Sequence, residues 1–585
     1  MRLTDEQLAA VNEPGHVCLT SCPGSGKTRV IVAKLLRCID QVAGSTRRAA
    51  CITHTNPAAD EIECRLKEIC FGTEELYYDV CTIHGFALQN ILRPFHRLLP
   101  EFANGFEVLT SQSEEYAQKA AELLSEHGLR RQLIDEFERV QRSLDGSPIH
   151  LDTLPIEVQR EWCDWLDENS YITLNEIVHH SGRLVTAHEH IASALASRFA
   201  WILVDEFQDS SSGQVAILKA IHRFRRTTFF CVGDPNQSIY RFAGASPELL
   251  LDFANYIGAN VDHRLTGNFR SSAAICAVAE LLCASDPPMR AVGEHADCAY
   301  VPEHKVFATA SAGIFDYFLP MAAEMDIPLG RIAILSSWWV SLFNLAREMR
   351  ERGIPVIGPG ARPYKRSHQI AQLMEAVGGF LECHDARLGT AVQRAVFCLA
   401  ADLTNHTPQT IFNFAGRVAI CKLLAVAASA REDSNYASEW IQQAGDLMAD
   451  VLVEADILTE AAANSFRLSA KQMVEDILNR AGGDELTVEE LGIFARPENC
   501  IQLLTVHKAK GREFDAVALI EAHDGRFPHF SIDDVTDEDE RQAIYDESRR
   551  VVYVGATRAK RLLTFLTDTS HWRNRPSPFL AEMGF

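Results

Sequence analysis

The sequence lacks a long apolar run and a signal-peptide pattern at its start. The longest apolar candidate, around residues 419–430, is interrupted by Lys422 and is shorter than the roughly 18–20 residues that a membrane helix needs. The first residues, MRLTDEQ, have no apolar core of the kind found in signal peptides. We therefore expect a cytoplasmic chain with no membrane partner.

Paired cysteines and excess positive charge are missing as well. The 16 cysteines include no Cys-x-x-Cys pair, so their spacing indicates neither a zinc site nor an iron–sulfur site. The 56 Lys and Arg residues against 79 Asp and Glu give a formal net charge of −23, which argues against a generally basic nucleic-acid coat. A local groove can still be basic, so the overall charge leaves nucleic acid open as a partner.

Short apolar runs alternate with helical patterns in several parts of the chain. Such runs between amphipathic helices indicate parallel sheets with both faces covered. The runs lie at residues 16–20, 49–53, 201–204, 228–232, 331–335, 500–504, 516–520 and 562–565. The sequence thus predicts an α/β fold with two lobes, each carrying a mainly helical insertion. We expect the first lobe at 1–90 and 199–262 with its insertion at 91–198, and the second lobe at 263–362 and 497–585 with its insertion at 363–496.

A glycine-rich segment, SCPGSGKT at residues 21–28, lies between a predicted strand and a predicted helix. Glycines let backbone N–H groups surround a phosphate chain, and the N-terminus of the following helix adds positive potential. In this pattern Lys27 reaches the β- and γ-phosphates, and the Thr28 hydroxyl ligates Mg²⁺. A plain glycine-rich turn is the alternative, and Ser21 stands where Gly or Ala is usual. The flanking strand and helix favour ATP and Mg²⁺ as cofactors.

Two carboxylates, Asp205 and Glu206, directly follow the apolar run at 201–204. In a P-loop enzyme the first would hold Mg²⁺ and the second would orient the attacking water. An acidic pair after a strand is common by itself. The segments QDS at 208–210 and GDPNQSIY at 233–240, the latter after the next predicted strand, strengthen the interpretation.

These motifs together resemble the UvrD/PcrA/Rep helicases of superfamily 1. Other segments are similar to motifs of that family: LTDEQ at 3–7, THTNPAA at 53–59, TIHGF at 82–86, LTGNFRS at 265–271, LTVHKAKGREF at 504–514 and ESRRVVYVGATRA at 547–559. The resemblance extends over most of the chain. It implies two recA-like P-loop lobes with ATP hydrolysed between them, and hence an ATP-dependent DNA helicase.

The resemblance also assigns residues to the ATP site. It implies that Gln237 senses the γ-phosphate, and that Arg270 and Arg558 are arginine fingers supplied by the second lobe. Such fingers can raise a phosphoryl-transfer rate by roughly 10³–10⁵-fold.

The base and sugar of the nucleotide are assigned in the same way. Gln7 would read the adenine edge, Arg29 and Phe269 would enclose its ring, and Glu513 would contact the ribose. Outside a motif, an exposed Arg or Phe is usually an ordinary surface or core residue. The remaining nucleotide-binding residues are Gly24, Ser25, Gly26, Lys27 and Thr28.

A further group of residues matches the positions where the family contacts single-stranded DNA. Bases stack on aromatic side chains, with roughly 1–3 kcal/mol per stacked base. Tyr240 and Phe242 match such aromatic positions, although either could instead belong to the core. The implied DNA-binding residues are His54, Asn56, Thr82, His84, Tyr240, Phe242, Thr505 and His507.

Several departures from the family pattern bear on DNA binding. The usual Phe and Lys of the first DNA motif are His54 and Pro57, and the usual Arg of the third is Ala243. These changes predict a weaker grip on DNA. The segment HKAKG at 507–511 resembles the 3′→5′ branch, which implies 3′→5′ movement on single-stranded or tailed DNA.

A second interpretation is a DNA-stimulated ATPase subunit that senses nucleic acid and regulates a partner nuclease without being a robust helicase alone. The weakened motifs and the compact chain motivate it. In this respect the chain resembles the helicase subunits encoded beside OLD-family nucleases in Gabija-type antiphage defence. A third interpretation is a P-loop NTPase unrelated to nucleic acid, which ATP hydrolysis indifferent to any nucleic acid would favour.

Overall fold

A computed structural model describes most of the chain in two compact units. The described residues are 2–70, 73–111, 113–143, 145–149, 151, 153–241, 244, 246–366, 368, 370–404, 409–480, 486–573 and 575–585. Unit 1 comprises Met1–Ala299 and Ser531–Thr557, and unit 2 comprises Tyr300–Phe530 and Arg558–Phe585. We expected the boundary between the two lobes at residues 262–263, which is not where the division between the compact units falls. The expected lobes therefore stay a prediction.

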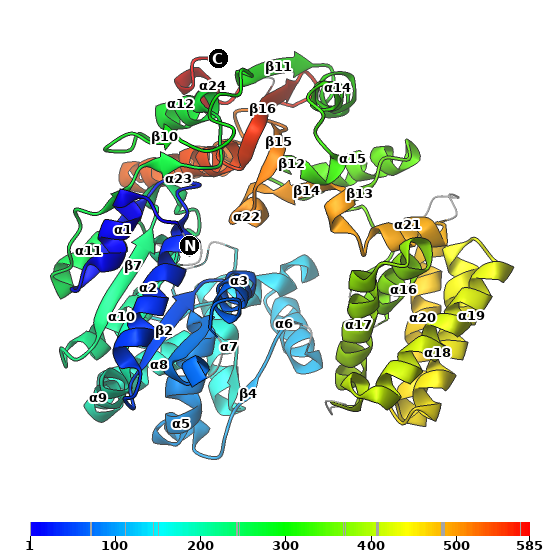
Figure 1. Cartoon of the computed structure of the whole chain (residues 1–585), viewed down its shortest axis with the longest axis horizontal. Helices are drawn as coiled ribbons and strands as arrows, with labels where there is room; N and C mark the ends of the chain where they lie inside the picture. Colours follow the sequence, from blue (N-terminus) through cyan, green and yellow to red (C-terminus); the bar gives the residue numbers. More distant parts are fainter. Residues whose placement is uncertain are drawn as a thin grey trace. The chain divides into compact units, whose positions relative to one another are not determined.

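Unit 1 is built on a six-stranded sheet whose neighbouring strands are all parallel (Figure 1). The strand order is β3 (Tyr78–Thr82), β2 (Arg48–Thr53), β6 (Phe199–Val204), β7 (Thr228–Gly233), β1 (Val17–Ser21) and β8 (Arg264–Leu265). Because β6, β7 and β1 are neighbours and run in the same direction, the segments that follow them emerge side by side.

Helices cover both faces of this sheet, as the apolar strands require. Along β7, Phe230 and Val232 belong to one apolar cluster, whereas Phe229 and Cys231 belong to the other. The first cluster includes residues of α1 (Asp5–Asn12), α2 (Lys27–Val42) and α3 (Asn56–Lys67). The second includes residues of α10 (Ser212–His222) and α11 (Glu248–Ile257). Successive side chains of a strand point to opposite faces, so β1, β2, β6 and β7 each contribute to both clusters.

The segment between β3 and β6 is mainly helical. It contains α4 (Ile83–Ala87), α6 (Glu114–Glu126), α7 (Ile156–Glu168), α8 (Leu174–Ala187), α9 (Glu189–Arg198) and a pair of two-residue strands, β4 (Glu107–Val108) and β5 (Tyr171–Ile172). Part of it has its own apolar cluster, in which Tyr116 and Phe137 pack against Trp162. Ile177 and Val178 of α8 instead join the main core of unit 1. Helix α8 therefore ties the helical segment to the sheet domain.

Residues 264–299 and α23 complete unit 1. The strands β9 (Gly267–Asn268) and β10 (Arg290–Ala291) form a short parallel pair, and α12 (Ala273–Leu282) lies between them in the chain. Helix α23 (Glu538–Ala556) belongs to the same unit, although it lies far along the sequence. The Arg550 side chain donates to the Ser238 carbonyl at 2.8 Å, which connects α23 to the loop after β7.

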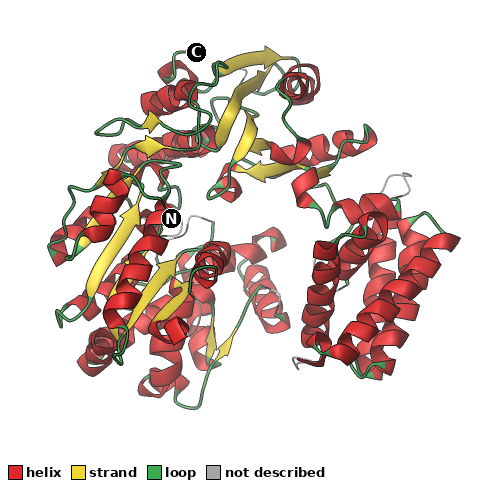
Figure 2. Ribbon diagram, viewed as in Figure 1, coloured by secondary structure: helices red, strands yellow, loops and turns green. Residues whose placement is uncertain are grey.

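Unit 2 contains a second six-stranded sheet, also parallel throughout (Figure 2). Its order is β11 (Glu303–Phe307), β16 (Ala559–Asp568), β15 (Phe514–Leu519), β12 (Ile332–Ser336), β14 (Ile501–Thr505) and β13 (Val356–Ile357). Helix α15 (Val340–Glu351) follows β12 in the chain. The predicted strands at 331–335, 500–504 and 516–520 correspond to β12, β14 and β15.

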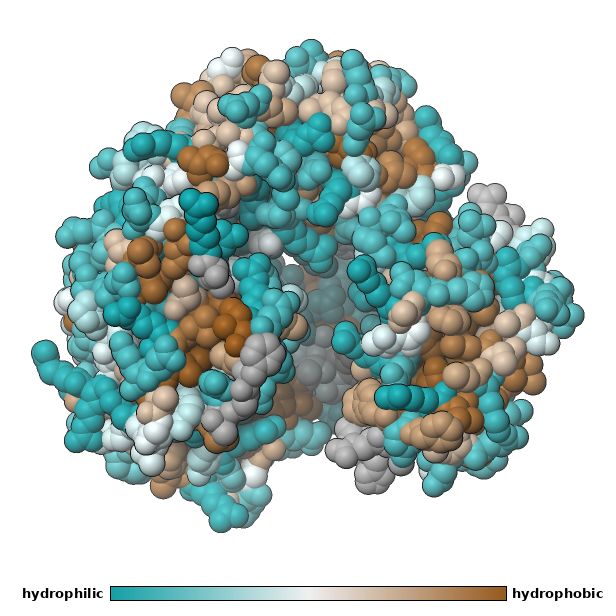
Figure 3. Space-filling model, viewed as in Figure 1, coloured by the Kyte–Doolittle hydropathy of each residue, from teal (hydrophilic) through white to brown (hydrophobic). Residues whose placement is uncertain are grey.

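A helical bundle lies between β13 and β14 in the chain. It consists of α16 (Ala371–Cys383), α17 (Ala386–Thr404), α18 (Phe414–Asp433), α19 (Ala437–Glu454), α20 (Glu460–Arg480) and α21 (Val488–Ile493). Figure 3 shows hydrophobic residues among the hydrophilic ones on the surface of this bundle. Exposed apolar side chains of the bundle include Phe414, Leu468 and Leu478.

The predicted fold class is confirmed: the chain is α/β, with two parallel sheets and mainly helical insertions. Within the described residues, no helix combines the length and the apolar character needed to cross a bilayer.

Candidate functional site

The glycine-rich loop connects the end of β1 to the start of α2. Gly24 and Gly26 have φ values of +66° and +79°, in the left-handed region that favours glycine. A Cβ on Gly24 would lie 2.6 Å from Cβ of Arg270, so this glycine is also needed for close packing. The Ser25 hydroxyl is buried and has no hydrogen-bond partner within the described residues. A tight loop of this kind before a helix N-terminus fits a phosphate chain.

Lys27 begins α2 and faces the carboxylates that follow β6 and β7. Its Nζ lies 3.0 Å from Oε2 of Glu206. Burial alone would lower the pKa of Lys27, but the carboxylates of Glu206, Asp234 and Asp205 outweigh it and raise that pKa. Lys27 therefore keeps its positive charge inside the site.

Asp205 and Glu206 emerge from the end of β6, as predicted. Burial, followed by the neighbouring charge of Glu206, raises the pKa of Asp205 to about 7. Glu206 has a φ of +49° and its backbone N–H donates to Oδ1 of Asp205 at 2.9 Å. A non-glycine residue in the left-handed region carries strain, which is often found at functional sites.

The donor set near the loop fits Mg²⁺. Asp205 offers a carboxylate, and Thr28 in the first turn of α2 offers a hydroxyl, both of them the oxygen ligands that this cation prefers. Burial also raises the pKa of Asp234, to about 6. A divalent cation would favour the ionised form of such carboxyls, so the residues present suit a metal–nucleotide complex.

Gln208 and Gln237 connect the loops after β6 and β7. Sequence reasoning quoted Gln208 without a role, whereas the motif resemblance assigned Gln237 to sensing the γ-phosphate. Gln208 donates from Nε2 to Oε2 of Glu206 at 2.6 Å, and its Oε1 accepts from the Asp234 backbone N–H at 2.9 Å. Gln237 donates from Nε2 to Oδ2 of Asp234 at 2.7 Å. A chain of hydrogen bonds thus runs from Lys27 to Gln237. The signal in the sequence was their place directly after two buried strands.

A cavity of about 320 Å³ lies next to the loop in unit 1. It is lined by Thr4, Asp5, Glu6, Gln7, Ser25, Leu265, Thr266, Gly267, Phe269, Arg290 and Val292. Gln7 is buried, and its Nε2 donates to the Ser25 carbonyl at 2.9 Å. Phe269 is 37% exposed. The structure thus brings together two of the residues predicted to bind adenine, while Arg29 is exposed on α2 and outside the lining set.

The two predicted arginine fingers belong to different compact units. Arg270, expected in the second lobe, lies in unit 1 beside Gly24, and its Nη1 donates to the Thr557 carbonyl at 3.2 Å. Arg558 belongs to unit 2, where it is buried and donates to the Arg512 carbonyl at 3.3 Å. Glu513 is also in unit 2, and pairs with Lys560 at 2.7 Å.

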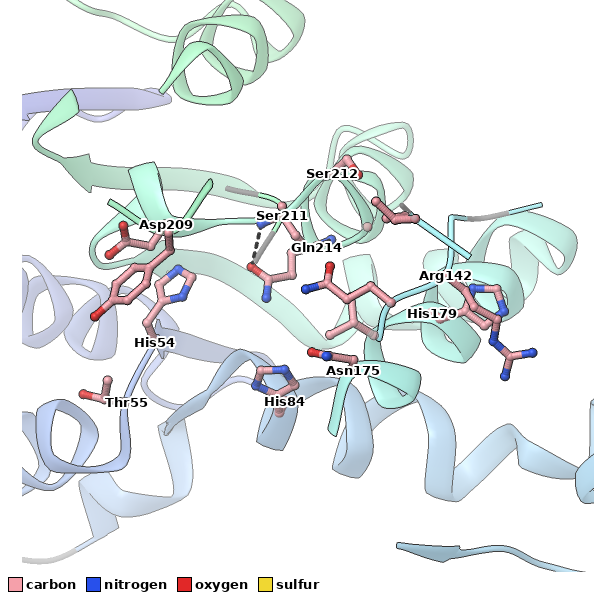
Figure 4. Close-up of a pocket in the computed structure, with 16 residues that line it drawn as sticks. His54, Thr55, His84, Arg142, Asn175, His179, Asp209, Ser211, Ser212 and Gln214 are labelled. Atoms are coloured by element: carbon pink, nitrogen blue, oxygen red, sulfur yellow. Dashed lines mark hydrogen bonds between the residues drawn. The ribbon is translucent and has the colours of Figure 1, made fainter. Parts of the chain in front are cut away.

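A second cavity of unit 1, of about 220 Å³, collects predicted DNA-binding residues (Figure 4). It brings together His54, His84 and Tyr240, which follow β2, β3 and β7 in the chain. Burial lowers the pKa of His84. The full lining is His54, Thr55, His84, Gln141, Arg142, Ile149, Asn175, Val178, His179, Asp209, Ser211, Ser212, Gly213, Gln214, Tyr240 and Gly244.

The other predicted DNA-binding residues lie elsewhere. Asn56 is exposed at the start of α3. Thr82 caps α4, with its Oγ1 accepting from the Gly85 N–H at 3.2 Å, and Thr505 of unit 2 caps a short helix, α22 (Val506–Ala509), in the same way. His507 lies in α22, and Phe242 is outside the described residues.

Sequence reasoning missed the six lining residues that come from the helical insertion: Gln141, Arg142, Ile149, Asn175, Val178 and His179. They belong to none of the motifs, and only tertiary packing brings them to the cavity. Asn175, Val178 and His179 lie on α8, which packs beside α10. No local pattern in the sequence could have identified them.

Arg142 is the centre of a buried charged cluster. It donates to both carboxylate oxygens of Asp167, at 2.7 and 2.9 Å, and also to Glu176 and to Nε2 of His180. Asp167, Glu176 and His180 have ligand atoms close enough together to hold a metal ion. The guanidinium already lies against them, so the cluster is a structural ion-pair network.

Comparisons with known proteins agree with the motifs. The family model for the UvrD/REP helicase N-terminal domain matches residues 3–257, and that for the UvrD-like helicase C-terminal domain matches residues 455–570. The ATP-dependent DNA helicase Rep of Escherichia coli is 24% identical over 663 residues, covering 100% of this chain and 94% of Rep. The ATP-dependent DNA helicase UvrD2 of Mycobacterium tuberculosis is 24% identical over 599 residues, covering 95% of this chain and 77% of UvrD2.

Proposed function

The chain belongs to the UvrD/Rep-type superfamily 1 helicases and is an ATP-hydrolysing DNA helicase, and we propose that it moves 3′→5′ along single-stranded DNA. The observation that supports the motor best is the arrangement of Lys27, after β1, with Asp205 and Glu206, after β6, at the same edge of one parallel sheet beside the glycine loop. The direction is supported by the resemblance of residues 507–511 to the 3′→5′ branch.

The chain's own residues account for ATP binding in this proposal. Lys27 and the backbone of residues 24–27 would hold the phosphates, and Thr28 with Asp205 would hold Mg²⁺. The bound Mg²⁺ neutralises negative charge on the phosphates and so assists phosphoryl transfer. Phe269 and Gln7 would receive the adenine in the cavity that they line.

Glu206 is the residue that we propose to accept a proton from the attacking water. Its Oε2 accepts hydrogen bonds from Lys27 and Gln208, which hold the carboxylate in place. Gln208 and Asp234 connect Glu206 to Gln237, so a change at Gln237 can reach the base. The roles of Arg270 and Arg558 as arginine fingers rest on the motif resemblance.

The test is ATP hydrolysis by the purified chain, with and without single-stranded DNA, beside Glu206→Gln. We expect stimulation by DNA, and a loss of roughly 10²–10⁴-fold in the variant because general-base catalysis is removed. Glu63→Gln is the matched control, since Glu63 is an exposed member of an i,i+4 pair on α3. Hydrolysis by Glu206→Gln close to wild type would reject the assignment.

Direction is tested separately, with duplexes that carry a single-stranded tail on one end. A 3′ tail is expected to support unwinding. Unwinding that needs a 5′ tail would overturn the 3′→5′ proposal and leave the ATP-site assignments intact.

A second candidate function is a DNA-stimulated ATPase subunit that regulates a separate nuclease, such as an OLD-family protein. One observation favours it: Arg142 is the only Lys or Arg that lines the described DNA cavity, and Asp167 and Glu176 balance its charge. A groove without an unbalanced cation predicts a modest grip on phosphates. DNA-stimulated hydrolysis without unwinding by the chain alone, with unwinding restored by a co-purifying nuclease, would favour this candidate.

A further inference from the structure

The loop after β7 is held from two sides within unit 1. This 235–241 loop contains Gln237, which belongs to the hydrogen-bond chain at the ATP site, and Tyr240, which lines the cavity of about 220 Å³. On one side, the Ser238 hydroxyl donates to the Gln208 carbonyl at 3.1 Å, which connects the loop to the segment that follows β6. On the other side, the loop meets helix α23.

Two side chains of α23 bond to backbone atoms on either side of Tyr240. The Nε of Arg550 donates to the Ser238 carbonyl at 2.8 Å. The Oε1 of Glu547 accepts from the Arg241 N–H at 3.0 Å. Glu547 and Arg550 are three residues apart, so they lie on the same face of the helix. Together they hold the backbone before and after the aromatic residue.

Charged groups make both of these contacts. Burial raises the pKa of Glu547, and the Arg241 N–H and the positive charges of Arg550 and Arg241 offset part of that rise. A hydrogen bond that involves an ionised donor or acceptor is stronger than one between neutral groups. The loop is therefore attached to α23 more firmly than neutral hydrogen bonds would attach it.

The C-terminal end of α23 lies at the phosphate loop. The carbonyl of Thr557, the first residue after the helix, accepts from Nη1 of Arg270 at 3.2 Å, and Arg270 lies against Gly24. Residues 551–556 of the helix are buried, and close-packed interiors transmit displacements because they are hard to compress. One continuous helix therefore joins the 235–241 loop to the Arg270 guanidinium.

We propose that Glu547 and Arg550 are positioning residues that make ATP hydrolysis depend on bound DNA. A strand bound against the 235–241 loop would fix the loop, α23 would be held with it, and the Thr557 carbonyl would place the Arg270 guanidinium at the phosphate loop. The inference rests on the proposed function, since it requires DNA at the cavity and ATP at the glycine-rich loop.

The first test measures ATP hydrolysis with and without a saturating thymine oligonucleotide in wild type, Arg550→Leu and Arg550→Lys. Leucine removes the donor to the Ser238 carbonyl, whereas a lysine ammonium can still donate to it. We expect the stimulated kcat to fall by roughly two- to tenfold in Arg550→Leu, the range that corresponds to one lost hydrogen bond, and the basal rate to change less. Arg550→Lys should recover most of the stimulation.

Arg541→Leu is the matched control, because Arg541 is exposed on the same helix. The same stimulation in Arg550→Leu and wild type would overturn the proposal, and so would an equal loss of the basal and stimulated rates, which indicates a structural defect. A wild-type rate that no DNA stimulates would instead contradict the proposed function.

Glu547 is tested by two substitutions that separate its hydrogen bond from its charge. Glu547→Gln keeps an oxygen that can accept from the Arg241 N–H, whereas Glu547→Leu removes both the acceptor and the charge. We expect Glu547→Gln to keep the stimulation and Glu547→Leu to lose a share similar to that lost in Arg550→Leu. An equal loss in both Glu547 variants would overturn the role of its hydrogen bond.

DNA affinity gives a readout that does not depend on hydrolysis. When two binding sites are coupled, each ligand changes the affinity for the other by the same factor. We expect a non-hydrolysable ATP analogue with Mg²⁺ to change the affinity of wild type and Arg541→Leu for the oligonucleotide, and to change that of Arg550→Leu less. A folding defect would weaken binding without altering this ratio, so an unchanged ratio in Arg550→Leu would overturn the proposal.

The last test asks whether the effect reaches Arg270. Substitutions at residues that act through one another are not additive. Arg550→Leu should therefore reduce the stimulated rate less in an Arg270→Lys background than in the wild-type background. The same fold loss in both backgrounds would overturn the step through Arg270.

Discussion

Unit 1 contains two clusters of buried charge that use the same kinds of residue in different settings. In one, Lys27 faces Glu206, Asp205 and Asp234 at the ends of parallel strands. In the other, Arg142 is held by Asp167 and Glu176 within the helical insertion. The first lies beside a glycine loop and contains a strained Glu206, whereas in the second the two terminal nitrogens of Arg142 already bond both carboxylates.

The difference shows that a buried charge cluster alone does not identify a catalytic site. Ionised partners that satisfy one another stabilise a local structure, provided that the geometry is good. A cluster becomes a candidate for chemistry when its groups lie beside space for a ligand and carry shifted pKa values. Asp205 and Asp234 meet these conditions, since their pKa values are raised to about 7 and about 6 and they lie beside the phosphate loop. In the other cluster, Arg142 already bonds Asp167 and Glu176.

The largest expected effect comes from Lys27→Met. Removing the cation at the phosphate site should lower DNA-stimulated ATP hydrolysis by roughly 10²–10³-fold or more. The steady-state rate of ATP hydrolysis measures this loss. Lys67→Met is the control, since Lys67 is an exposed residue of α3. Retention of more than a tenth of the wild-type rate would contradict the assignment of Lys27.

The matching change in the other cluster is Arg142→Leu, which should affect stability first. It leaves the buried Glu176 without its partner, a loss of about 3–5 kcal/mol. The midpoint of the earliest urea transition should fall, whereas Arg65→Leu, in an exposed pair with Glu61, should leave it unchanged. An unaltered midpoint in Arg142→Leu would remove the contrast between the clusters.

The two regions should also respond to pH in opposite directions. The pKa of Asp205 is raised to about 7, so the folded protein keeps a proton on this carboxyl that the unfolded chain loses above about pH 4. The stability that this proton gives the folded protein is therefore lost as the pH rises from about 4 towards 7. The pKa of His179 is lowered to about 4 by burial, so as the pH drops the unfolded chain gains a proton on this imidazole at a higher pH than the folded protein does. The stability of the folded protein therefore falls as the pH drops from about 6.5 towards 4.

Urea midpoints at pH 5 and pH 7.5 measure both effects in metal-free protein. Asp205→Asn should raise the midpoint relative to wild type mainly at pH 7.5, and His179→Phe mainly at pH 5. The same shift at both pH values would show that packing, and not titration, explains the variants.

The smallest effect is expected at Thr82, which caps α4 and is also a predicted DNA contact. Thr82→Asp keeps a good N-cap and adds negative charge, so it should preserve stability and weaken single-strand binding several-fold. Thr82→Ala should lose about 0.5–2 kcal/mol of stability. If Thr82→Asp binds DNA as wild type does, Thr82 serves only as a cap.

The elements that sequence patterns predicted share a strong apolar signal. The run at 201–204 is buried along its length in β6, and residues 229–232 of the next run are buried in β7. The edge strands β3 and β8 were missed because most of β3 is only partly buried and β8 has two residues. Their formation depends on a neighbouring strand that is already in place, which a local pattern does not show.

By itself, the sequence determined the α/β class, the phosphate loop and the carboxylates after β6, because each depends on residues close together in the chain. Tertiary packing alone decided that Arg270 lies beside Gly24, and that His179 and Asn175 join His54 and Tyr240 around one cavity. Those residues are distant in sequence, and their meeting follows from how α8 and the parallel strands pack against a common core.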